Sequence, residues 1–169
     1  AVSGTVIAND ADVDGDDLTY SLATEATNGT ATIDADGNYT YTPDSNFFGT
    51  DSFTYTATDA EGASTTATVT ITVGSVNDEP VVATAIDDQS DIDSDVVSLD
   101  VSGNFSDVED ANLTFAAAGL PPGLSIDAAG RITGTLDSSA SAAGPYTVQI
   151  TATDGEKSAN TSITCLDTA

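Results

Sequence analysis

The sequence contains no histidine and only two cationic side chains, Arg131 and Lys157, among its 169 residues. Without histidine, neither a Ser-His nor a Cys-His nucleophilic pair can form. Carboxylate pairs are abundant, so the proximity of two of them indicates nothing about glycoside hydrolysis, and we expect no enzyme. A nucleic-acid binder needs a basic surface to neutralise phosphates, so the lack of cations excludes that class. It also argues against docking on anionic lipid.

Cysteine, long apolar runs and helix formers are scarce as well. The single cysteine, Cys165, cannot form a disulfide within the chain, and we expect a small buried hydrophobe in the last strand. No apolar run approaches the length of about 18 residues that indicates a membrane span, so no membrane insertion is expected. Only five of the 28 acidic residues are glutamate, and no segment has a convincing helical pattern.

Acidic side chains are what the sequence has in excess, because 28 Asp and Glu residues give a net charge of −26. Carboxylates at this density repel one another and oppose compaction unless counter-ions screen or bind them. Calcium is a counter-ion of suitable chemistry, since it is bound by several oxygen ligands and Asp is the shortest ionised side chain that supplies them.

Apolar and polar residues alternate with a period of two, which predicts half-buried strands with a threonine-rich wet face. The clearest alternations lie in segments 53–58, 69–73 and 146–152. Glycine, asparagine and proline turn signals separate these segments, as at Asn28-Gly29 and Pro121-Pro122-Gly123. Short strands with frequent turns predict an all-β chain of antiparallel sandwiches.

An acidic stretch occurs twice, at residues 9–20 and 106–115, and each runs directly into a Leu-Thr-aromatic segment. Each is followed downstream by an identical Thr-Ala-Thr-Asp, which ends at Asp59 and at Asp154, and the two copies are 95 residues apart. This duplication predicts two domains, at 1–79 and 80–169, of roughly 80–90 residues each. The boundary is expected at 74–80, because a strong strand precedes this segment and Pro80 disfavours its continuation as a ladder strand. This linker is very short.

The acidic stretch that begins at Asp10 has three interpretations. It satisfies the first half of an EF-hand loop, but its twelfth position is Ser21, where that loop requires a bidentate Glu. It can be a solvated acidic turn with no ligand. It can also supply calcium ligands on a β-sandwich, with a further carboxylate from a distant strand end, and this is the interpretation that we favour.

The end of the first half has a characteristic order of a short motif, a strand and an acidic linker. Cadherin repeats end with Ala-x-Asp, a last strand and an Asp-x-Asn-Asp-Asn-x-Pro linker, and this chain has Ala57-Thr58-Asp59, the strand at 67–73 and Val76-Asn77-Asp78-Glu79-Pro80. With the further matches at 8–16, 39–43 and 46–55, the first half of the chain resembles the tandem cadherin-like repeats of giant bacterial secreted adhesins. The second half resembles dystroglycan-type cadherin-like (Ig-like) repeats at 86–89, 105–107, 119–127 and 130–135. The resemblance implies two tandem Ig/cadherin-like antiparallel β-sandwiches.

The resemblance also implies calcium ligands, position by position. In the linker and the second domain they are Asn77, Asp78, Glu79, Asp107, Glu109 and Asp154. In the first domain they are Asp12, Asp14 and Asp59. Two positions depart from the family's linker, since Ser75 stands where its first Asp is expected and Glu79 where its last Asn is expected. Fewer ions than in an animal cadherin junction are therefore expected.

The function implied by the resemblance is that of calcium-rigidified extender repeats in a large bacterial surface or secreted adhesin, which supports cell adhesion. We expect a monomeric extracellular chain whose partners are neighbouring repeats, with glycans or other cells reached through distal modules. One rival is a polysaccharide-binding module of a secreted protein or enzyme, with Tyr39, Tyr41, Phe47 and Phe48 as a stacking platform. Another is an acidic spacer that requires salt rather than calcium.

Overall fold

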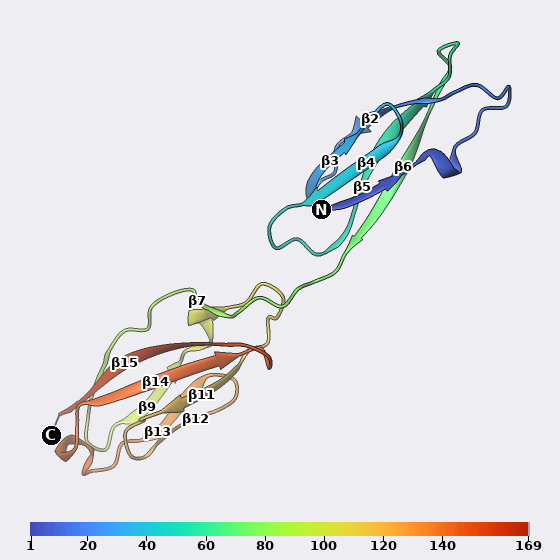
Figure 1. Ribbon diagram of the computed structural model, residues 1–169. Coiled ribbons are helices and arrows are strands. Elements are labelled where there is room, and N and C mark those ends of the chain that lie inside the picture. Colours follow the sequence, from blue (N-terminus) through green and yellow to red (C-terminus); the bar gives the residue numbers. More distant parts are fainter. Residues whose placement is uncertain (169) are drawn as a thin grey trace. The chain divides into compact units, whose positions relative to one another are not determined.

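Strands make up almost all of the regular structure in the computed structural model, which describes residues 1–168 (Figure 1). The chain divides into two units, Ala1–Val76 and Asn77–Ala169. Within the described residues, no helix is long and apolar enough to cross a membrane.

The first unit contains two three-stranded antiparallel sheets. One sheet has the order β1-β4-β3 and the other the order β2-β5-β6. The strands are β1 (Val2–Thr5), β2 (Thr19–Thr24), β3 (Gly29–Ile33), β4 (Asn38–Pro43), β5 (Gly49–Thr58) and β6 (Ser64–Val73). A short 3-10 turn, η1 (Ile7–Asn9), follows β1.

The core of the first unit is aromatic. Along β5, Phe53, Tyr55 and Ala57 are buried while the residues between them are not, which confirms the predicted alternation. Tyr41 of β4 is completely buried against Phe53, and Tyr20 of β2 packs at 6.0 Å from Tyr55, measured between ring centroids. Large aromatic rings therefore lie at the centre of this core, and each buries a large apolar area.

Asp51 is a buried carboxylate at the start of this core, only 6% exposed. It accepts hydrogen bonds from the backbone N–H groups of Thr27, Asn28 and Ser52 and from the Tyr41 hydroxyl, at 2.8–3.1 Å. Burial alone would raise the pKa of Asp51, but these donors lower it below its usual value. Burial and the bond to Asp51 raise the pKa of Tyr41 to about 12. Asp51 thus fixes the 27–28 turn.

The second unit is built from nine strands. They are β7 (Val81–Val82), β8 (Gln89–Ile92), β9 (Val96–Asp100), β10 (Phe105–Ser106), β11 (Thr114–Ala118), β12 (Leu124–Ile126), β13 (Arg131–Thr135), β14 (Tyr146–Thr153) and β15 (Ser158–Thr168). The principal sheets have the orders β11-β14-β15-β8 and β12-β13-β9, and β10 pairs with β7. Two 3-10 turns, η2 (Ser102–Asn104) and η3 (Ala140–Ala142), connect strands.

One pairing differs from the antiparallel arrangement that the sequence predicts. β8 runs parallel to the end of β15, with Gln89 opposite Cys165 and Ile92 opposite Thr168. The other pairings in the described residues are antiparallel. A parallel pair needs a long connection between its strands, and here the rest of the second unit supplies it.

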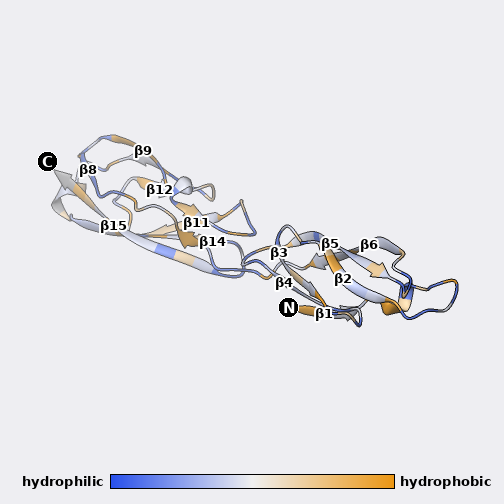
Figure 2. Cartoon of the chain, turned by 90° about the horizontal axis from the view of Figure 1, so that it is seen from above, coloured by the Kyte–Doolittle hydropathy of each residue, from blue (hydrophilic) through white to orange (hydrophobic). Residues whose placement is uncertain are grey.

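The core of the second unit is mainly aliphatic, with one buried aromatic ring from β10. Its buried members are Val101, Phe105, Ile132, Val148, Ile150, Ala152 and Ile163. Along β14, Val148, Ile150 and Ala152 are buried in alternation, as the sequence predicts. Cys165 packs against this core but is only half-buried, and burial raises the pKa of its thiol. Along the strands of both units, hydrophobic and hydrophilic residues lie side by side (Figure 2).

The duplication that the sequence shows is also present in the strand pairing of the two units. Thr19 of β2 pairs with Thr58 of β5, and Thr114 of β11 pairs with Thr153 of β14, each 95 residues later. The Thr19 hydroxyl donates to the Thr58 carbonyl at 3.2 Å, and the Thr114 hydroxyl donates to the Thr153 carbonyl at 3.3 Å. Residues of the two units can therefore be compared position by position.

Candidate functional site

Asp107 opens the acidic loop between β10 and β11, and its two carboxylate oxygens have different surroundings. Its Oδ1 accepts the backbone N–H groups of Glu109 and Asp110 at 2.9 and 2.8 Å, which sets the turn. Its Oδ2 is buried and has no hydrogen-bond partner among the described residues. A buried carboxylate oxygen without a partner is unfavourable, so a cation at this point would be stabilising.

The linker residues contact this loop and the turn that follows β14. The backbone N–H of Asp78 donates to Glu109 Oε2 at 2.9 Å, across 31 positions of the sequence. The side-chain amide of Asn77 donates to Asp154 Oδ2 at 2.9 Å. Both linker residues are half-buried, and Pro80, which follows them, is fully buried. The segment that the sequence predicts as a linker is therefore packed into the second unit at these positions.

Asp154 lies directly after β14, at the second repeat of Thr-Ala-Thr-Asp. Its Oδ1 accepts the backbone N–H groups of Glu156 and Lys157, both at 2.7 Å. The N–H of Lys157, the N–H of Glu156 and the amide of Asn77 together hold the pKa of Asp154 below its usual range. Asp154 is therefore ionised at neutral pH and presents a negative charge to the linker.

Lys157 is the second of the two cations, and sequence reasoning did not assign it to the site. Its Nζ donates to the backbone carbonyl oxygen of Asn77 at 2.6 Å, across 80 positions. The only signal in the sequence was that Lys157 is the single lysine of the chain. Comparison of the two repeats gave no further signal, because the first repeat has no lysine at the equivalent position. In the first unit, Ala63 occupies the equivalent position, since the N–H of each residue donates to the preceding Asp.

The six predicted ligands of the linker and second unit form what we call the second acidic cluster: Asn77, Asp78, Glu79, Asp107, Glu109 and Asp154. The structure brings together Asn77 with Asp154 and Asp78 with Glu109. Glu79 is exposed and joins none of these hydrogen bonds. Across the described part of the chain, no three His, Cys, Asp or Glu side chains gather closely enough to hold a metal ion. The calcium assignment of these residues thus remains a prediction.

The first unit carries an equivalent first acidic cluster, defined by Asp12, Asp14 and Asp59. Asp12 Oδ1 accepts the backbone N–H groups of Asp14, Gly15 and Asp16 at 2.8–3.4 Å, as Asp107 does in its own loop. Asp59 Oδ1 accepts the N–H of Ala63 at 2.8 Å. Asp12 and Asp59 line one hollow of about 380 Å³, whereas Asp14 is exposed.

Asp10 also lines this hollow, although it is absent from the predicted ligand set. The buried Tyr55 hydroxyl donates to its carboxylate at 2.9 Å, and burial, followed by this bond, raises the pKa of Tyr55. The comparison of the two repeats did not identify Asp10 as a site residue, because the residue 95 positions later is Phe105, which belongs to the core. Asp10 therefore ties the acidic loop to the aromatic core.

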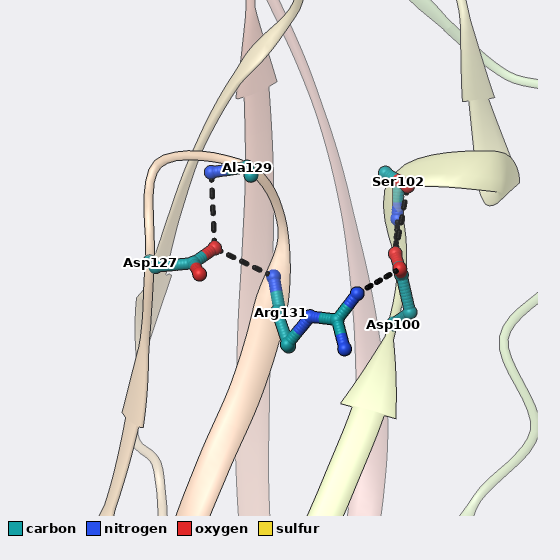
Figure 3. Close-up of polar contacts among 5 residues, drawn as sticks. All are labelled: Asp100, Ser102, Asp127, Ala129 and Arg131. Carbon is teal, nitrogen blue, oxygen red and sulfur yellow. Dashed lines mark hydrogen bonds and ion pairs between the residues drawn. The ribbon is translucent and has the colours of Figure 1, made fainter.

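Turn formation alone accounts for many of the other carboxylates. Figure 3 shows Asp127, whose Oδ1 accepts the N–H groups of Ala129 and Arg131 at 3.0 and 2.9 Å. It also shows the Arg131 guanidinium beside Asp100 of β9, at 3.4 Å. Both partners of this ion pair are about half exposed, so it adds little stability. Unlike Asp107, neither Asp127 nor Asp100 has a buried oxygen without a hydrogen-bond partner.

The four aromatic residues of the rival sugar-stacking platform differ in exposure. Tyr41 is completely buried, and Tyr39 packs edge-on against Phe53 with ring centroids 5.5 Å apart. Phe47 is half-buried, and Phe48 is 43% exposed. Two of the four rings that a sugar-stacking row would need, Tyr39 and Tyr41, therefore pack within the first unit.

Residues 79–166, just over half of the chain, match the family model described as Putative Ig domain. The chain belongs to this family. In the first unit of this Ig-family chain, residues 1–72 match the model described as Bacterial Ig domain. No curated protein matches the sequence.

Solved structures that resemble this Ig-family chain include cadherin repeats. The structure of PcdhgB3 EC1-4 aligns with a TM-score of 0.68 at 18% identity, over 99% of this chain and 45% of that one. Chicken VE-cadherin EC1-2 aligns with a TM-score of 0.59 at 15% identity, over 100% and 93%. The chain therefore spans less than half of the first of these structures. At these identities the likeness shows the fold alone, and it confirms tandem Ig/cadherin-like sandwiches.

Proposed function

We propose that this chain is a pair of non-catalytic extender repeats of an extracellular protein, in which Ca²⁺ binds the second acidic cluster and orders the linker. The observation that carries the proposal is the buried, unpaired Oδ2 of Asp107. It lies in the same loop as Glu109, whose carboxylate already receives the linker N–H of Asp78. A divalent ion bound there would supply the partner that Asp107 Oδ2 lacks among the described residues.

The donor set has the chemistry that calcium requires. Calcium is bound by 6–8 oxygen ligands from carboxylates, carbonyls, amides and water in a flexible geometry. Asp107, Glu109 and Asp154 supply carboxylate oxygens, and Asn77 supplies amide and carbonyl oxygens. The Asn77 contact is made through its side-chain amide N–H, so rotation of that amide would bring its oxygen toward the ion. The Asp78 contact is made through its backbone N–H and leaves the Asp78 carboxylate free to turn toward the ion. A small shift of the linker side chains is therefore part of the proposal.

Electrostatics explains how binding would order the linker. Carboxylates within a Debye length of about 8 Å repel one another, and an ion of charge +2 reverses the sign of that interaction. An ion that binds only the ordered state stabilises it by about 2.7 kcal/mol when its free concentration is 100 times Kd. Extracellular calcium modules bind at roughly 10⁻⁴ to 10⁻³ M, so millimolar calcium outside a cell would be sufficient.

In this proposal the repeats extend a longer surface or secreted protein, so that distal modules reach glycans or other cells. The support is the cadherin-like fold of both units and the duplication of the acidic loop. The polysaccharide-binding alternative lacks comparable support, because Tyr41 is buried in the core and Tyr39 packs against Phe53. The acidic-spacer alternative predicts that calcium and other salts stabilise the chain equally at the same ionic strength.

The direct test is calcium titration by calorimetry on Asp107→Asn, with Asp127→Asn as the matched control. Both substitutions remove one charge from a turn-forming aspartate and preserve the Oδ1 acceptor. We expect Asp107→Asn to weaken binding at least about tenfold, the equivalent of 1.4 kcal/mol, and Asp127→Asn to leave it unchanged. Equal losses in the two variants would assign the effect to total charge and remove the specific site.

A further inference from the structure

Lys157 has a fixed place in the turn that follows β14. Its backbone N–H donates to Asp154 Oδ1 at 2.7 Å, and its backbone carbonyl oxygen accepts the Thr153 hydroxyl at 2.6 Å. From this turn, Lys157 Nζ reaches the backbone carbonyl oxygen of Asn77 at 2.6 Å. Hydrogen bonds from charged donors are shorter and stronger than those from neutral ones. Lys157 therefore ties the turn to the linker.

The group that Lys157 contacts is unexpected in so acidic a chain. The sequence has 28 acidic residues, yet the one ion pair within the described residues joins Arg131 to Asp100. Lys157 donates instead to a neutral carbonyl oxygen. Backbone carbonyl oxygens are calcium ligands, and that of Asn77 belongs to the proposed ligand set. The single lysine thus occupies an oxygen that the ion would use.

An ammonium group and a calcium ion cannot share this oxygen favourably. Calcium lies 2.3–2.6 Å from its ligand oxygens, and Lys157 Nζ lies 2.6 Å from the Asn77 oxygen. The two cations would then be at most about 5 Å apart, which is inside the Debye length of about 8 Å, so their repulsion is poorly screened. Lys157 is exposed, and its flexible four-carbon stem lets the ammonium move into water. Calcium bound at this oxygen would therefore displace it.

The first acidic cluster has no such cation. Ala63 occupies the position equivalent to Lys157, and its N–H donates to Asp59 Oδ1 at 2.8 Å. Both cationic side chains of the sequence lie in the second unit. Since the two turns share the backbone contact and differ in the cation, the ammonium of Lys157 is not required for the turn.

We propose that Lys157 is a tethered competitor of calcium at the second acidic cluster. Without calcium, its ammonium binds the Asn77 carbonyl oxygen and holds the linker. When Ca²⁺ binds, the ion takes this oxygen and the ammonium moves into solvent. The exchange raises the calcium concentration at which the cluster fills, because binding must break the Lys157 contact. This inference rests on the proposed function, since it concerns regulation of the same site.

The test measures the mobility of the Lys157 side chain in the full chain, by ¹³C NMR relaxation of its Cε methylene group. Lys157 is the single lysine, so its signal is unambiguous. The order parameter of this group should indicate a restrained side chain in chelator and should fall by about half in saturating CaCl2. NaCl at equal ionic strength should leave it unchanged. Calorimetric titration of the same samples establishes whether calcium binds.

Asp107→Asn is the matched variant, because Asp107 makes no contact with Lys157 among the hydrogen bonds described above. It should keep the restrained lysine in chelator. At a calcium concentration equal to the Kd of the parent chain, it should show about a fifth of the parent's change or less, as a tenfold loss of affinity requires.

The outcomes separate this exchange from the proposed function. Calcium binding with an unchanged Lys157 order parameter would overturn the exchange and leave the proposed function standing, whereas no calcium binding would overturn both. A lysine that is already mobile in chelator, or that NaCl releases equally, would also overturn the exchange. So would a full release of Lys157 in Asp107→Asn at the parent's Kd.

Discussion

Asn77 donates its side-chain amide to Asp154 at 2.9 Å, which joins the start of the second unit to the end of β14 across 77 residues. The same Asn77 receives the Lys157 ammonium at its carbonyl oxygen. A segment of linker composition is thus fixed by a carboxylate and a lysine from a single hairpin. The predictions below follow from this contact and from the buried carboxylates around it.

Asn77→Ala should destabilise the second unit by about 1–2 kcal/mol in chelator, because a hydrogen bond to an ionised carboxylate contributes about 1.5–3 kcal/mol and this one is only partly buried. Denaturant unfolding of the full chain measures the change. Asn160→Ala is the control, since Asn160 is exposed and accepts one long contact of 3.5 Å from Gln149. A loss as large in the control would show that Asn77 has no special role.

Lys157→Gln should tighten calcium binding, because it removes a positive charge from the carbonyl oxygen of Asn77, a proposed ligand. We expect an increase in affinity of about three- to tenfold, which is 0.7–1.4 kcal/mol. Arg131→Gln changes the net charge equally, but Arg131 pairs with Asp100, which is not a residue of the cluster. Calorimetric titration compares the two variants, and equal effects would mean that only net charge matters.

Acidification should destabilise the second unit through Asp154. Hydrogen bonds from the backbone N–H groups of Lys157 and Glu156 and from the amide of Asn77 depress its pKa in the folded state. A depressed pKa gives stability that is present above the unfolded value of about 3.9 and is lost as pH falls through the folded value. Asp154→Asn should therefore flatten the pH dependence of the unfolding free energy below about pH 4. An unchanged slope in this variant would contradict the assignment.

Tyr41→Phe should destabilise the first unit by about 1–3 kcal/mol, because it leaves an oxygen of buried Asp51 without its hydroxyl donor. The pKa of Asp51 should also rise, since that hydroxyl is one of the donors that lower it. Tyr39→Phe is the matched control, because the Tyr39 ring packs on Phe53 and its hydroxyl makes no hydrogen bond in the described residues. Thermal unfolding and carboxyl NMR titration provide the two readouts.

The repeated and strongly periodic parts of the fold could be predicted from the sequence. β5 and β14 alternate with a period of two, and their two copies of Thr-Ala-Thr-Asp mark equivalent strand ends. β8 could not be predicted in the same way, because Gln89-Ser90-Asp91-Ile92 has no strand-like composition and is positioned by its partner β15. Tertiary pairing decides such short segments.

For the candidate site, the positions of Asp107, Glu109 and Asp154 could be inferred from duplication and from family resemblance. The contacts of Asp10 and Lys157 could not, because neither residue is repeated in the other half of the chain. The unpaired state of Asp107 Oδ2 depends on how the loop folds over it. No spacing rule in the sequence encodes that burial.

The measurement that tests the central claim most directly is amide hydrogen exchange at Asn77 and Asp78 in CaCl2, MgCl2 and NaCl at equal ionic strength. The account predicts that calcium slows exchange at these linker amides more than magnesium or sodium does, because Mg²⁺ demands a tighter octahedral geometry and Na⁺ only screens charge. Asp107→Asn should abolish the calcium-specific part. Equal protection by all three salts would contradict a specific calcium site and would favour the acidic spacer.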